Sequence, residues 1–286
     1  MAHCATPLPR CLDCGGKVLK LNRPQVMGVL NVTPDSFSDG GKYLILERAL
    51  WRARQMMQEG AAIIDVGGES TRPGAAPVSV EEELHRVIPV IEALSREIPI
   101  PLSVDTSKPE IMRAAVAAGA GFINDINALR QEGALAAASE LGVPICLMHM
   151  RGKPQTMQQN PVYSDVVEEV REFLLERIIA CEQSGIPSER LMLDPGFGFG
   201  KQSVHNLLLL KYLNRICELG FPVLVGLSRK SLIGTMLTLP VEERLYGGLA
   251  LATLAAWQGA TIVRTHDVQA TMQALTLCDN VQKAEE

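Results

Sequence analysis

The sequence predicts a single (β/α)8 TIM barrel, one ring of parallel strands with a helix after each strand. Short apolar runs of strand character recur along the chain, each run closes on a polar group or a glycine, and a segment able to form a helix follows. There are about eight such runs, at intervals of roughly 20 to 45 residues, which is the rhythm of this barrel. The runs end at Leu30, Asp65, Asp105, Asp125, His149, Asp194, Gly226 and Arg264.

Length and composition agree with one domain that acts on small molecules. The chain has 286 residues, and barrels of this size commonly form a single core. A net charge of −5, with 21% charged residues and no basic block, argues against nucleic acid as a partner. No apolar run is long enough to span a bilayer, and the N-terminus lacks the layout of a secretory signal. We therefore expect a cytoplasmic protein with no membrane partner.

The N-terminal segment, residues 1–25, is expected to stand apart from a barrel at 26–283. Cys11 and Cys14 are separated by two residues and followed by Gly15, which resembles half of a zinc ribbon, but no matching second half follows. The interpretation we favour is a β-hairpin that turns at Gly15 and plugs the bottom of the barrel. The seven cysteines, an odd number, fit free thiols better than a disulfide framework; Cys4 also lies in this segment.

Two long polar loops follow the first two predicted strands. The first begins at Asn31 and reads NVTPDSFSDGG, and the second begins at Asp65 and reads DVGGESTRPG, with Arg72 inside it. Glycine, proline, serine and aspartate favour turns over a continued strand. Apolar spacing predicts a helix over Leu44–Gly60 between the two loops. Both loops should lie on the same rim, because the carboxyl ends of barrel strands share one face.

Hydrogen-bond acceptors and cations are expected to meet on this rim. The acceptors are Asp105, Asn124 and Asp194, each at the end of a strand. The cationic groups are Arg72, Lys230, Arg264 and His266. Most of these cations follow the last two strands, where such barrels commonly bind phosphate. Lys230 follows its strand at a spacing that should point it inward.

The segment after the sixth strand reads DPGFGFGK from Asp194. Alternating glycines would let the backbone and two phenyl rings approach a flat ligand. The segment is not a Walker phosphate loop, because Pro195 stands where the first glycine is needed and no Ser or Thr follows Lys201.

Several polar residues also have a purely structural interpretation. Asp105 could cap the helix after its strand, and Asp65 and Asp125 are better explained by structural roles than by catalysis. His149 is more easily explained as a hydrogen-bonded rim histidine, and Arg229 could equally form a surface ion pair.

The acceptors suit a ligand with a donor-rich edge. An ionised aspartate can accept two parallel hydrogen bonds from a ring NH and an exocyclic amine. A 2-amino-4-oxo-pteridine or a guanine has such an edge, and an arginine can lie flat against the ring. Because cations gather on the same rim, the inferred ligand is a flat heterocycle that carries an anion.

Six motifs, in this order, closely resemble bacterial dihydropteroate synthase, a family of pterin-binding barrels. They are NVTPDSFSDGG from Asn31, DVGGESTRPG from Asp65, SVDTSK from Ser103, DPGFGFGK from Asp194, SRKS from Ser228 and RTHD from Arg264. The resemblance runs from about Val26 to the last helix. Only the cysteine-bearing N-terminus departs from the family pattern.

The resemblance implies a transferase of folate biosynthesis. Enzymes of this family condense 6-hydroxymethyl-7,8-dihydropterin diphosphate with p-aminobenzoate to 7,8-dihydropteroate and release diphosphate, and sulfonamides compete with p-aminobenzoate. The resemblance also implies a homodimer formed through outer helices, and Mg2+ as a cofactor.

The family's site residues carry over to matching positions of this sequence. The pterin would be held by Asp105, Asn124, Asp194 and Lys230 and lined by Met148, Phe199 and Arg264. The diphosphate would be held by Arg72, Arg264 and His266, with Mg2+ bound through Asn31. The p-aminobenzoate site would comprise Phe37, Thr71, Pro73 and Ser228. The catalytic groups would be Asp105, Lys230, Arg264 and His266.

Two alternative functions stay open at this point. A methyltransferase that passes a methyl group from methyltetrahydrofolate to a corrinoid protein would share the barrel and the pterin floor, but it would not need the cations around Arg72 and Arg264. A non-catalytic pterin-binding homologue would be expected to have lost part of that anion site, and no part is lost in this sequence.

Overall fold

The computed structural model describes residues 11–33, 42–70, 74 and 76–285. Within these ranges an eight-stranded parallel sheet forms the predicted barrel. Its strands are β3 (Gln25–Asn31), β4 (Ile63–Gly67), β5 (Leu102–Asp105), β6 (Phe122–Asp125), β7 (Ile145–Met148), β8 (Leu191–Asp194), β9 (Leu224–Gly226) and β10 (Ile262–Thr265). They pair in the order β8-β7-β6-β5-β4-β3-β10-β9. The ring closes where the Leu193 N–H donates to the Pro222 carbonyl at 2.9 Å and Leu193 bridges Val223.

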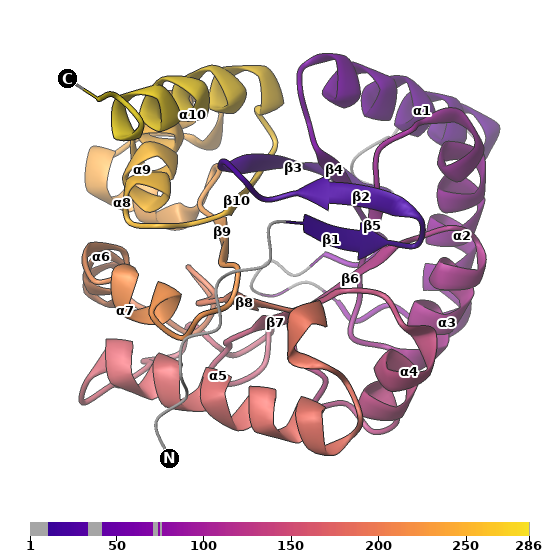
Figure 1. The fold of residues 1–286 in the computed structure, drawn as a ribbon, viewed down its shortest axis with the longest axis horizontal. Helices are drawn as coiled ribbons and strands as arrows, with labels where there is room; N and C mark the ends of the chain where they lie inside the picture. The colour runs from indigo at the N-terminus through magenta and orange to yellow at the C-terminus, as the bar shows by residue number, and fades with distance from the viewer. Residues whose placement is uncertain (1–10, 34–41, 71–73, 75, 286) are drawn as a thin grey trace.

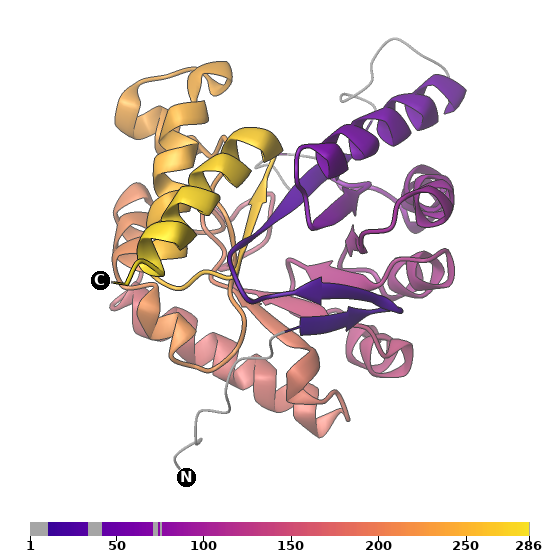
Figure 2. The ribbon, with the colours of Figure 1, turned by 45° about the horizontal axis from the view of Figure 1, so that its top comes forward.

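Helices surround this ring of strands (Figure 1). They are α1 (Lys42–Gln58), α2 (Val80–Glu97), α3 (Pro109–Ala117), α4 (Ala134–Leu141), α5 (Val166–Gln183), α6 (Ser203–Lys211), α7 (Asn214–Cys217), α8 (Ser231–Leu237), α9 (Leu245–Trp257) and α10 (Val268–Gln282), with 3-10 turns at Ser188–Arg190 and Val241–Glu243. Figure 2 shows α10 beside α1, so the last helix closes the ring against the first. Of the helices in the described ranges, none has the length and apolar character needed to cross a membrane.

The main core lies between the sheet and the helices. Outward-facing strand residues such as Ile64 and Val104 pack with helix residues such as Val87 and Ile91 in one continuous buried cluster. The predicted helix over 44–60 corresponds to α1, and Gly60, at a φ of 103°, takes the left-handed conformation that ends the helix.

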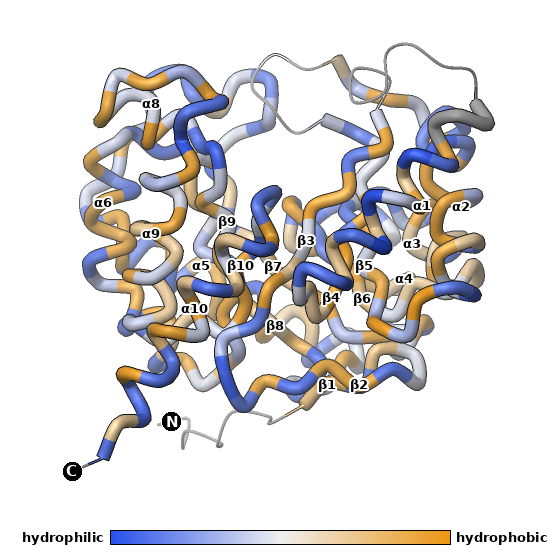
Figure 3. The backbone as a smooth tube through the Cα atoms, turned by 90° about the horizontal axis from the view of Figure 1, so that it is seen from above, coloured by the Kyte–Doolittle hydropathy of each residue, from blue (hydrophilic) through white to orange (hydrophobic). Residues whose placement is uncertain are grey.

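The lower interior of the barrel is apolar, and the N-terminal hairpin plugs it. Strands β1 (Cys11–Cys14) and β2 (Lys17–Lys20) pair antiparallel and lie across the base of the barrel (Figure 3). Leu12, Cys14 and Leu19 are buried there, whereas Cys11 is exposed. They share one cluster with the inward-facing residues Met27, Ile63, Phe122, Cys146, Met192, Leu224 and Ile262. The predicted plug is therefore confirmed.

Polar contacts fasten the hairpin to the barrel. The Lys17 ammonium donates to the carbonyl oxygens of Ile98 at 2.7 Å and Ile100 at 3.3 Å, just beyond the carboxyl end of α2, where a cation is favourable. The hairpin also touches the backbone before β6, because a Cβ added to Gly121 would lie 2.0 Å from the Cys14 carbonyl oxygen. Only glycine allows this approach.

The inward-facing layer above the apolar one is polar. Side chains two residues apart in a strand lie on the same face. Two residues beyond members of the apolar cluster come Asp65, Asn124, Met148, Asp194, Gly226 and Arg264. Because side chains alternate along each strand, a layer of carboxylates, an amide and a guanidinium lies directly above the apolar cluster.

We predict that Gly121→Ala lowers the thermal unfolding midpoint. The added methyl group collides with the Cys14 carbonyl, so the hairpin or β6 must move, at an expected cost of about 1 to 3 kcal/mol. Gly248→Ala is the matched control, because its Cβ would meet nothing closer than 3.9 Å and alanine favours helix. Equal midpoints in the two variants would mean that the hairpin is not seated against β6.

Candidate functional site

Arg264 lies at the centre of the polar layer and joins three strands. From β10, its Nε donates to Asp65 Oδ2 on β4 at 2.6 Å, and one terminal nitrogen donates to Asp105 Oδ2 at the end of β5 at 2.8 Å. Asn124 on β6 donates through Nδ2 to the same Asp65 oxygen at 3.0 Å. The structure thus brings Asp105, Asn124 and Arg264 together, as predicted, and adds Asp65 as their shared partner.

Burial changes the protonation chemistry of this cluster. It raises the pKa of Asp105 to about 7, against the opposing attraction of Arg264, and the nearby carboxylate of Asp65 raises it further. The pKa of Arg264 is raised, because the attraction of Asp65 and Asp105 outweighs the effect of burial. Arg264 is therefore permanently charged, while Asp105 changes its protonation state near neutral pH. Asp105 does not cap α3, whose N-cap is Lys108.

Asp194 lies across the mouth at the end of β8. Its side chain is buried and its Oδ1 accepts from the Gly196 N–H at 2.7 Å. Burial raises the pKa of Asp194 to about 6, although Gly196 and Lys230 lower it. Burial also lowers the pKa of Lys230 to about 8. Lys230 points inward, as predicted, and its ammonium lies 4.2 Å from the centre of the Phe199 ring.

An apolar wall stands beside these charges. Met148 and Phe199 belong to one buried cluster with Met150 and Met157. Thioether groups and a phenyl ring offer a polarisable surface for a flat aromatic ligand. The predicted lining residues therefore lie together, next to Asp194 and Lys230.

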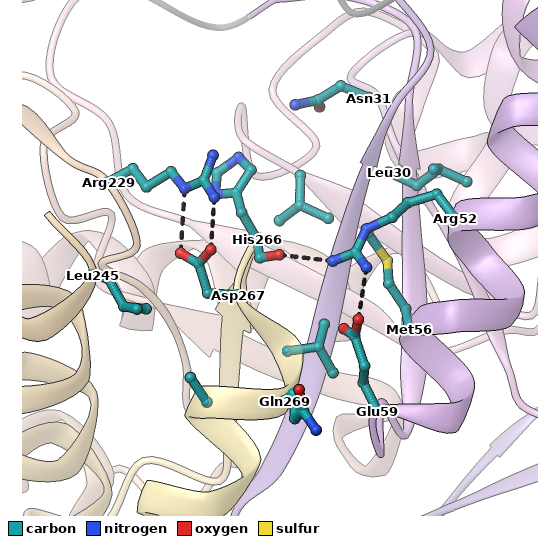
Figure 4. Close-up of a pocket in the computed structure, with 13 residues that line it drawn as sticks. Leu30, Asn31, Arg52, Met56, Glu59, Arg229, Leu245, His266, Asp267 and Gln269 are labelled. Atoms are coloured by element: carbon teal, nitrogen blue, oxygen red, sulfur yellow. Dashed lines mark hydrogen bonds and ion pairs between the residues drawn. The ribbon is translucent and has the colours of Figure 1, made fainter. Parts of the chain in front are cut away.

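A cavity of about 510 Å³ opens beside the polar layer, between α1 and the start of α10 (Figure 4). Asn31, at the end of β3, and His266, after β10, both line it. Arg52 on α1 reaches across it and donates to the His266 carbonyl at 3.0 Å and to Glu59 at 2.9 Å. Arg229 forms a two-pronged pair with Asp267 on the other side.

His266 and Ser228 are neighbours at this cavity. Ser228 Oγ lies 3.1 Å from His266 Nδ1 and accepts from the His266 backbone N–H at 3.3 Å. Burial lowers the pKa of His266 to about 4, and the nearby Arg264 and Arg229 lower it further. The lowered pKa favours an uncharged ring in the free protein, and the positive charge expected of His266 stays a prediction. The neutral ring offers one hydrogen-bond donor and one acceptor.

Four predicted site residues lie outside the described part of the chain. They are Phe37, Thr71, Arg72 and Pro73.

The structural interpretations of other polar residues are resolved. Asp125 accepts from the backbone N–H groups of Asn127 at 2.8 Å and Leu129 at 2.7 Å, so its role is structural, as expected. Arg229 forms the surface ion pair that was one of its two interpretations. His149 is a hydrogen-bonded rim histidine, and its partner is Lys201.

Sequence reasoning missed two residues that hold the site in place, Asp65 and Lys201. The sequence favours a structural role for Asp65, and in the structure this carboxylate orients Arg264 and Asn124. The inward position of Asp65 could be predicted from the alternation of side chains along its strand, because Asp65 follows the inward-facing Ile63 by two residues. In the sequence, Lys201 bears only on the excluded phosphate motif, whereas in the structure it is buried.

This arrangement can bind a flat ring by its polar edge and an anion beside it. The mouth of the barrel is lined by the carboxylates of Asp105 and Asp194, the amide of Asn124 and the ammonium of Lys230. The guanidinium of Arg264 is fixed between them. Ionised carboxylates suit a donor-rich ring edge, and preorganised cations stabilise charge that develops during bond cleavage.

Comparison with known proteins agrees with this chemistry. The sequence pattern of pterin binding enzymes matches residues 27–266. The dihydropteroate synthase of Escherichia coli strain K12 is 55% identical over 271 residues, which cover 95% of this chain and 96% of the relative.

Solved structures give the same answer. The dihydropteroate synthase of Xanthomonas albilineans, solved with 4-aminobenzoic acid, is 56% identical with a TM-score of 0.92 and covers 96% of this chain and 99% of its own. The Yersinia pestis dihydropteroate synthase, solved as a sulfonamide drug complex, is 49% identical with a TM-score of 0.92. The match covers 96% of this chain and 100% of the Yersinia pestis chain. This chain therefore belongs to the dihydropteroate synthase family of pterin binding enzymes, and it is a transferase of folate biosynthesis.

Proposed function

We propose that the polar mouth of the barrel condenses 6-hydroxymethyl-7,8-dihydropterin diphosphate with p-aminobenzoate and releases diphosphate. The observation that carries this proposal is the convergence of Asp105, Asn124, Asp194, Lys230 and Arg264 at one mouth of the barrel. Asp194 and Asp105 accept from the donor edge of the pterin, and Asn124 and Lys230 donate to its other polar atoms. Met148 and Phe199 line the ring.

Arg264 acts on both halves of the pterin substrate. Asp65 and Asp105 fix two of its nitrogens, so the plane of the guanidinium is set before the substrate arrives. A flat, permanently charged group can stack on the ring and hold the departing diphosphate. Lysine has no flat face and cannot do both.

The reaction needs charge stabilisation more than a strong base. The methylene of an electron-rich dihydropterin can lose diphosphate to give a delocalised cation, which the carboxylates of Asp105 and Asp194 favour. The arylamine is already neutral at pH 7, so its lone pair is available for attack on that carbon. The amine proton leaves after the C–N bond has formed, and diphosphate carries away the electron pair of the broken C–O bond.

The diphosphate is assigned to the side of the mouth next to the cavity. His266 lines that side and can donate from its neutral ring, and Arg264 lies two residues before it in the same strand exit. Arg72 is assigned here by resemblance. This placement puts the leaving group on the last strands of the barrel, where phosphate commonly binds.

The residues present fit Mg2+ bound through Asn31. A Cβ at Gly67 would lie 3.7 Å from both Asn31 Oδ1 and Asp105 Oδ2, so two hard oxygens lie beside the same glycine, and Asp105 Oδ2 also accepts from Arg264. Among the described residues, no group of three or more His, Cys, Asp or Glu could hold a metal, but Mg2+ is commonly held by few protein oxygens together with substrate phosphates. When bound, the ion would neutralise charge on the diphosphate.

The p-aminobenzoate site is assigned to Ser228 with Phe37, Thr71 and Pro73, and sulfonamides would compete there. Ser228 lies beside His266, which supports a position for the second substrate next to the leaving group. Free thiols at Cys14, Cys146 and Cys181 support a reducing, cytoplasmic location. Exposed apolar side chains on α9, such as Leu254 and Trp257, support a homodimer formed through outer helices.

Diphosphate release tests the function directly. The purified protein is mixed with Mg2+, pterin diphosphate and p-aminobenzoate, and each organic substrate is omitted in turn. Release that requires both substrates, with formation of 7,8-dihydropteroate, is the expected result. Binding of the pterin without turnover would indicate a non-catalytic homologue.

Asp194→Asn should weaken pterin binding while the fold stays intact. The asparagine presents one donor where the ligand also donates, so one charge-assisted bond is lost and a partner is left unpaired, at a cost of roughly 2 to 4 kcal/mol. Calorimetric titration with the pterin measures this loss.

Asp125→Asn is the matched control, because this buried aspartate accepts from the Asn127 and Leu129 N–H groups and the Ser107 hydroxyl, none of which is assigned to the ligand. It should lower the unfolding midpoint and leave pterin affinity unchanged. An unchanged pterin affinity in Asp194→Asn would remove Asp194 from the floor.

Pterin affinity should fall as the pH decreases through about 6, the pKa to which burial raises Asp194. Protonation removes one acceptor oxygen, so the affinity is full above this pH and declines below it. The probe is 6-hydroxymethylpterin without diphosphate, because phosphate groups titrate in the same range. Asp105 titrates near pH 7 in wild type, so the test is the difference between wild type and Asp194→Asn. Identical profiles would contradict the assignment.

Arg264→Lys should lose most turnover. An ammonium cannot bridge Asp65 and Asp105, and breaking a buried ion pair typically costs about 3 to 5 kcal/mol. Arg113→Lys is the control, since its pair with Glu140 is exposed. Diphosphate release at saturating substrates measures the effect, and full activity in Arg264→Lys would refute the stacking role.

A further inference from the structure

Lys201 is a buried ammonium to which the proposed mechanism gives no task. Its side chain is 3% exposed, and its Nζ lies 2.8 Å from His149 Nδ1, 2.9 Å from the Gly196 carbonyl and 3.2 Å from the Phe199 carbonyl. Burial lowers the pKa of Lys201 to about 7, and the three hydrogens of its protonated form meet these three acceptors. In the part of the chain that the structure describes, no carboxylate forms an ion pair with it, although the charge of Asp194 opposes the lowering of its pKa by burial.

His149 is a fixed partner for this ammonium. Its backbone N–H donates to the Asp194 carbonyl at 2.9 Å, and its ring packs edge-on against Phe173 with 4.9 Å between ring centres. Burial lowers the pKa of His149 to about 2, and the charge of Lys201 lowers it further. The ring is therefore neutral, and Nδ1 is its acceptor nitrogen. The contact ties the exit of β7 to the segment after β8.

The segment from Pro195 to Lys201 is wrapped tightly against the exit of β7. Gly196 and Gly200 take left-handed φ angles of 69° and 63°. A Cβ at Gly196 would lie 1.9 Å from the His149 carbonyl oxygen, and one at Gly200 would lie 2.3 Å from the Arg151 carbonyl oxygen. This wrapping turns backbone carbonyls toward the Lys201 ammonium, which neutralises their converging negative ends.

The same segment carries contacts of the pterin site. The Gly196 N–H binds Asp194 Oδ1 at 2.7 Å, and the Phe199 ring lies in the apolar wall with Met148. The Lys230 ammonium lies over that ring. Three pterin-binding side chains, those of Asp194, Phe199 and Lys230, thus depend on the path of this segment.

We propose that Lys201 is a positioning residue for the pterin half of the site. Its ammonium holds the Gly196 and Phe199 carbonyls against His149, and this fixes the segment on which Asp194, Phe199 and Lys230 rely. The inference rests on the proposed pterin site and deepens it. Because the second substrate is assigned to Ser228 and other loops, the effect of Lys201 is selective for the pterin.

Kinetics of Lys201→Met and Lys201→Gln test this role. Methionine keeps the apolar stem and removes every donor, whereas glutamine keeps a neutral amide donor. In Lys201→Met, the KM for pterin diphosphate should rise by about tenfold or more, because small displacements of positioned groups have large effects. Lys201→Gln should recover part of this loss. The KM for p-aminobenzoate, measured at saturating pterin diphosphate, should stay unchanged.

Two variants accompany the test. Lys20→Met removes an exposed lysine of β2 at the opposite end of the barrel and should behave as wild type. His149→Phe keeps the ring packing and removes the acceptor, so it should reproduce the selective rise in pterin KM. If Lys201→Met does not fold, the pterin KM of His149→Phe tests the positioning role in its place.

The outcomes separate this inference from the proposed site. A folded Lys201→Met with unchanged pterin KM, or with both KM values raised together, would overturn the positioning role. If Asp194→Asn weakens pterin binding and Lys201→Met does not, only Lys201 loses its role. If Asp194→Asn leaves pterin binding unchanged, the proposed site itself fails.

Discussion

The bridge from Arg264 to Asp65 and Asp105 organises the mouth of this barrel. It joins residues 199 and 159 positions apart in the sequence, so it forms only when β10 has closed against β3 and β4 has paired with β5. Asp65 is fully buried, and a buried charge is tolerated only with well-placed partners. One Asp65 oxygen receives both Arg264 and Asn124, so two site residues on opposite sides of β4 and β5 share one anchor.

The two acceptors of the floor make the folded protein less stable at neutral pH. The pKa values of Asp105 and Asp194 are raised to about 7 and about 6. A carboxyl group whose pKa is raised on folding stabilises the fold only in its protonated form, so this contribution is lost as the pH rises through those values. At neutral pH Asp194 is largely ionised and Asp105 is partly ionised, and each ionised carboxylate lowers the stability of the fold while it offers acceptors to a donor-rich ligand. The apolar layer and the hairpin plug beneath them offset this cost.

Much of the fold could be read from local sequence signals, and part of the site could not. The apolar runs predict the ends of every barrel strand to within one or two residues. For example, β7 ends at Met148, one residue before the predicted His149, and β10 continues one residue beyond the predicted Arg264, to Thr265. The pairing of Arg264 with Asp65, and of Lys201 with His149, depends instead on the stagger of neighbouring strands. In β7 and β8, Met148 lies opposite Asp194, and this register is what brings the two strand exits together. A single sequence does not state such registers.

Backbone strain at Arg229 explains how one short turn serves two parts of the site. Arg229 has a φ of 58°, a conformation that costs a side-chain-bearing residue about 1 kcal/mol or more. The turn places Ser228 against His266 and the Lys230 ammonium over Phe199, while the side chain between them points outward to Asp267. The paired guanidinium and the Arg244 contact to the Arg229 carbonyl at 3.2 Å offset the strain. Three consecutive residues can thereby face the proposed p-aminobenzoate site, the outer surface and the proposed pterin site, which a regular strand or helix end would not allow.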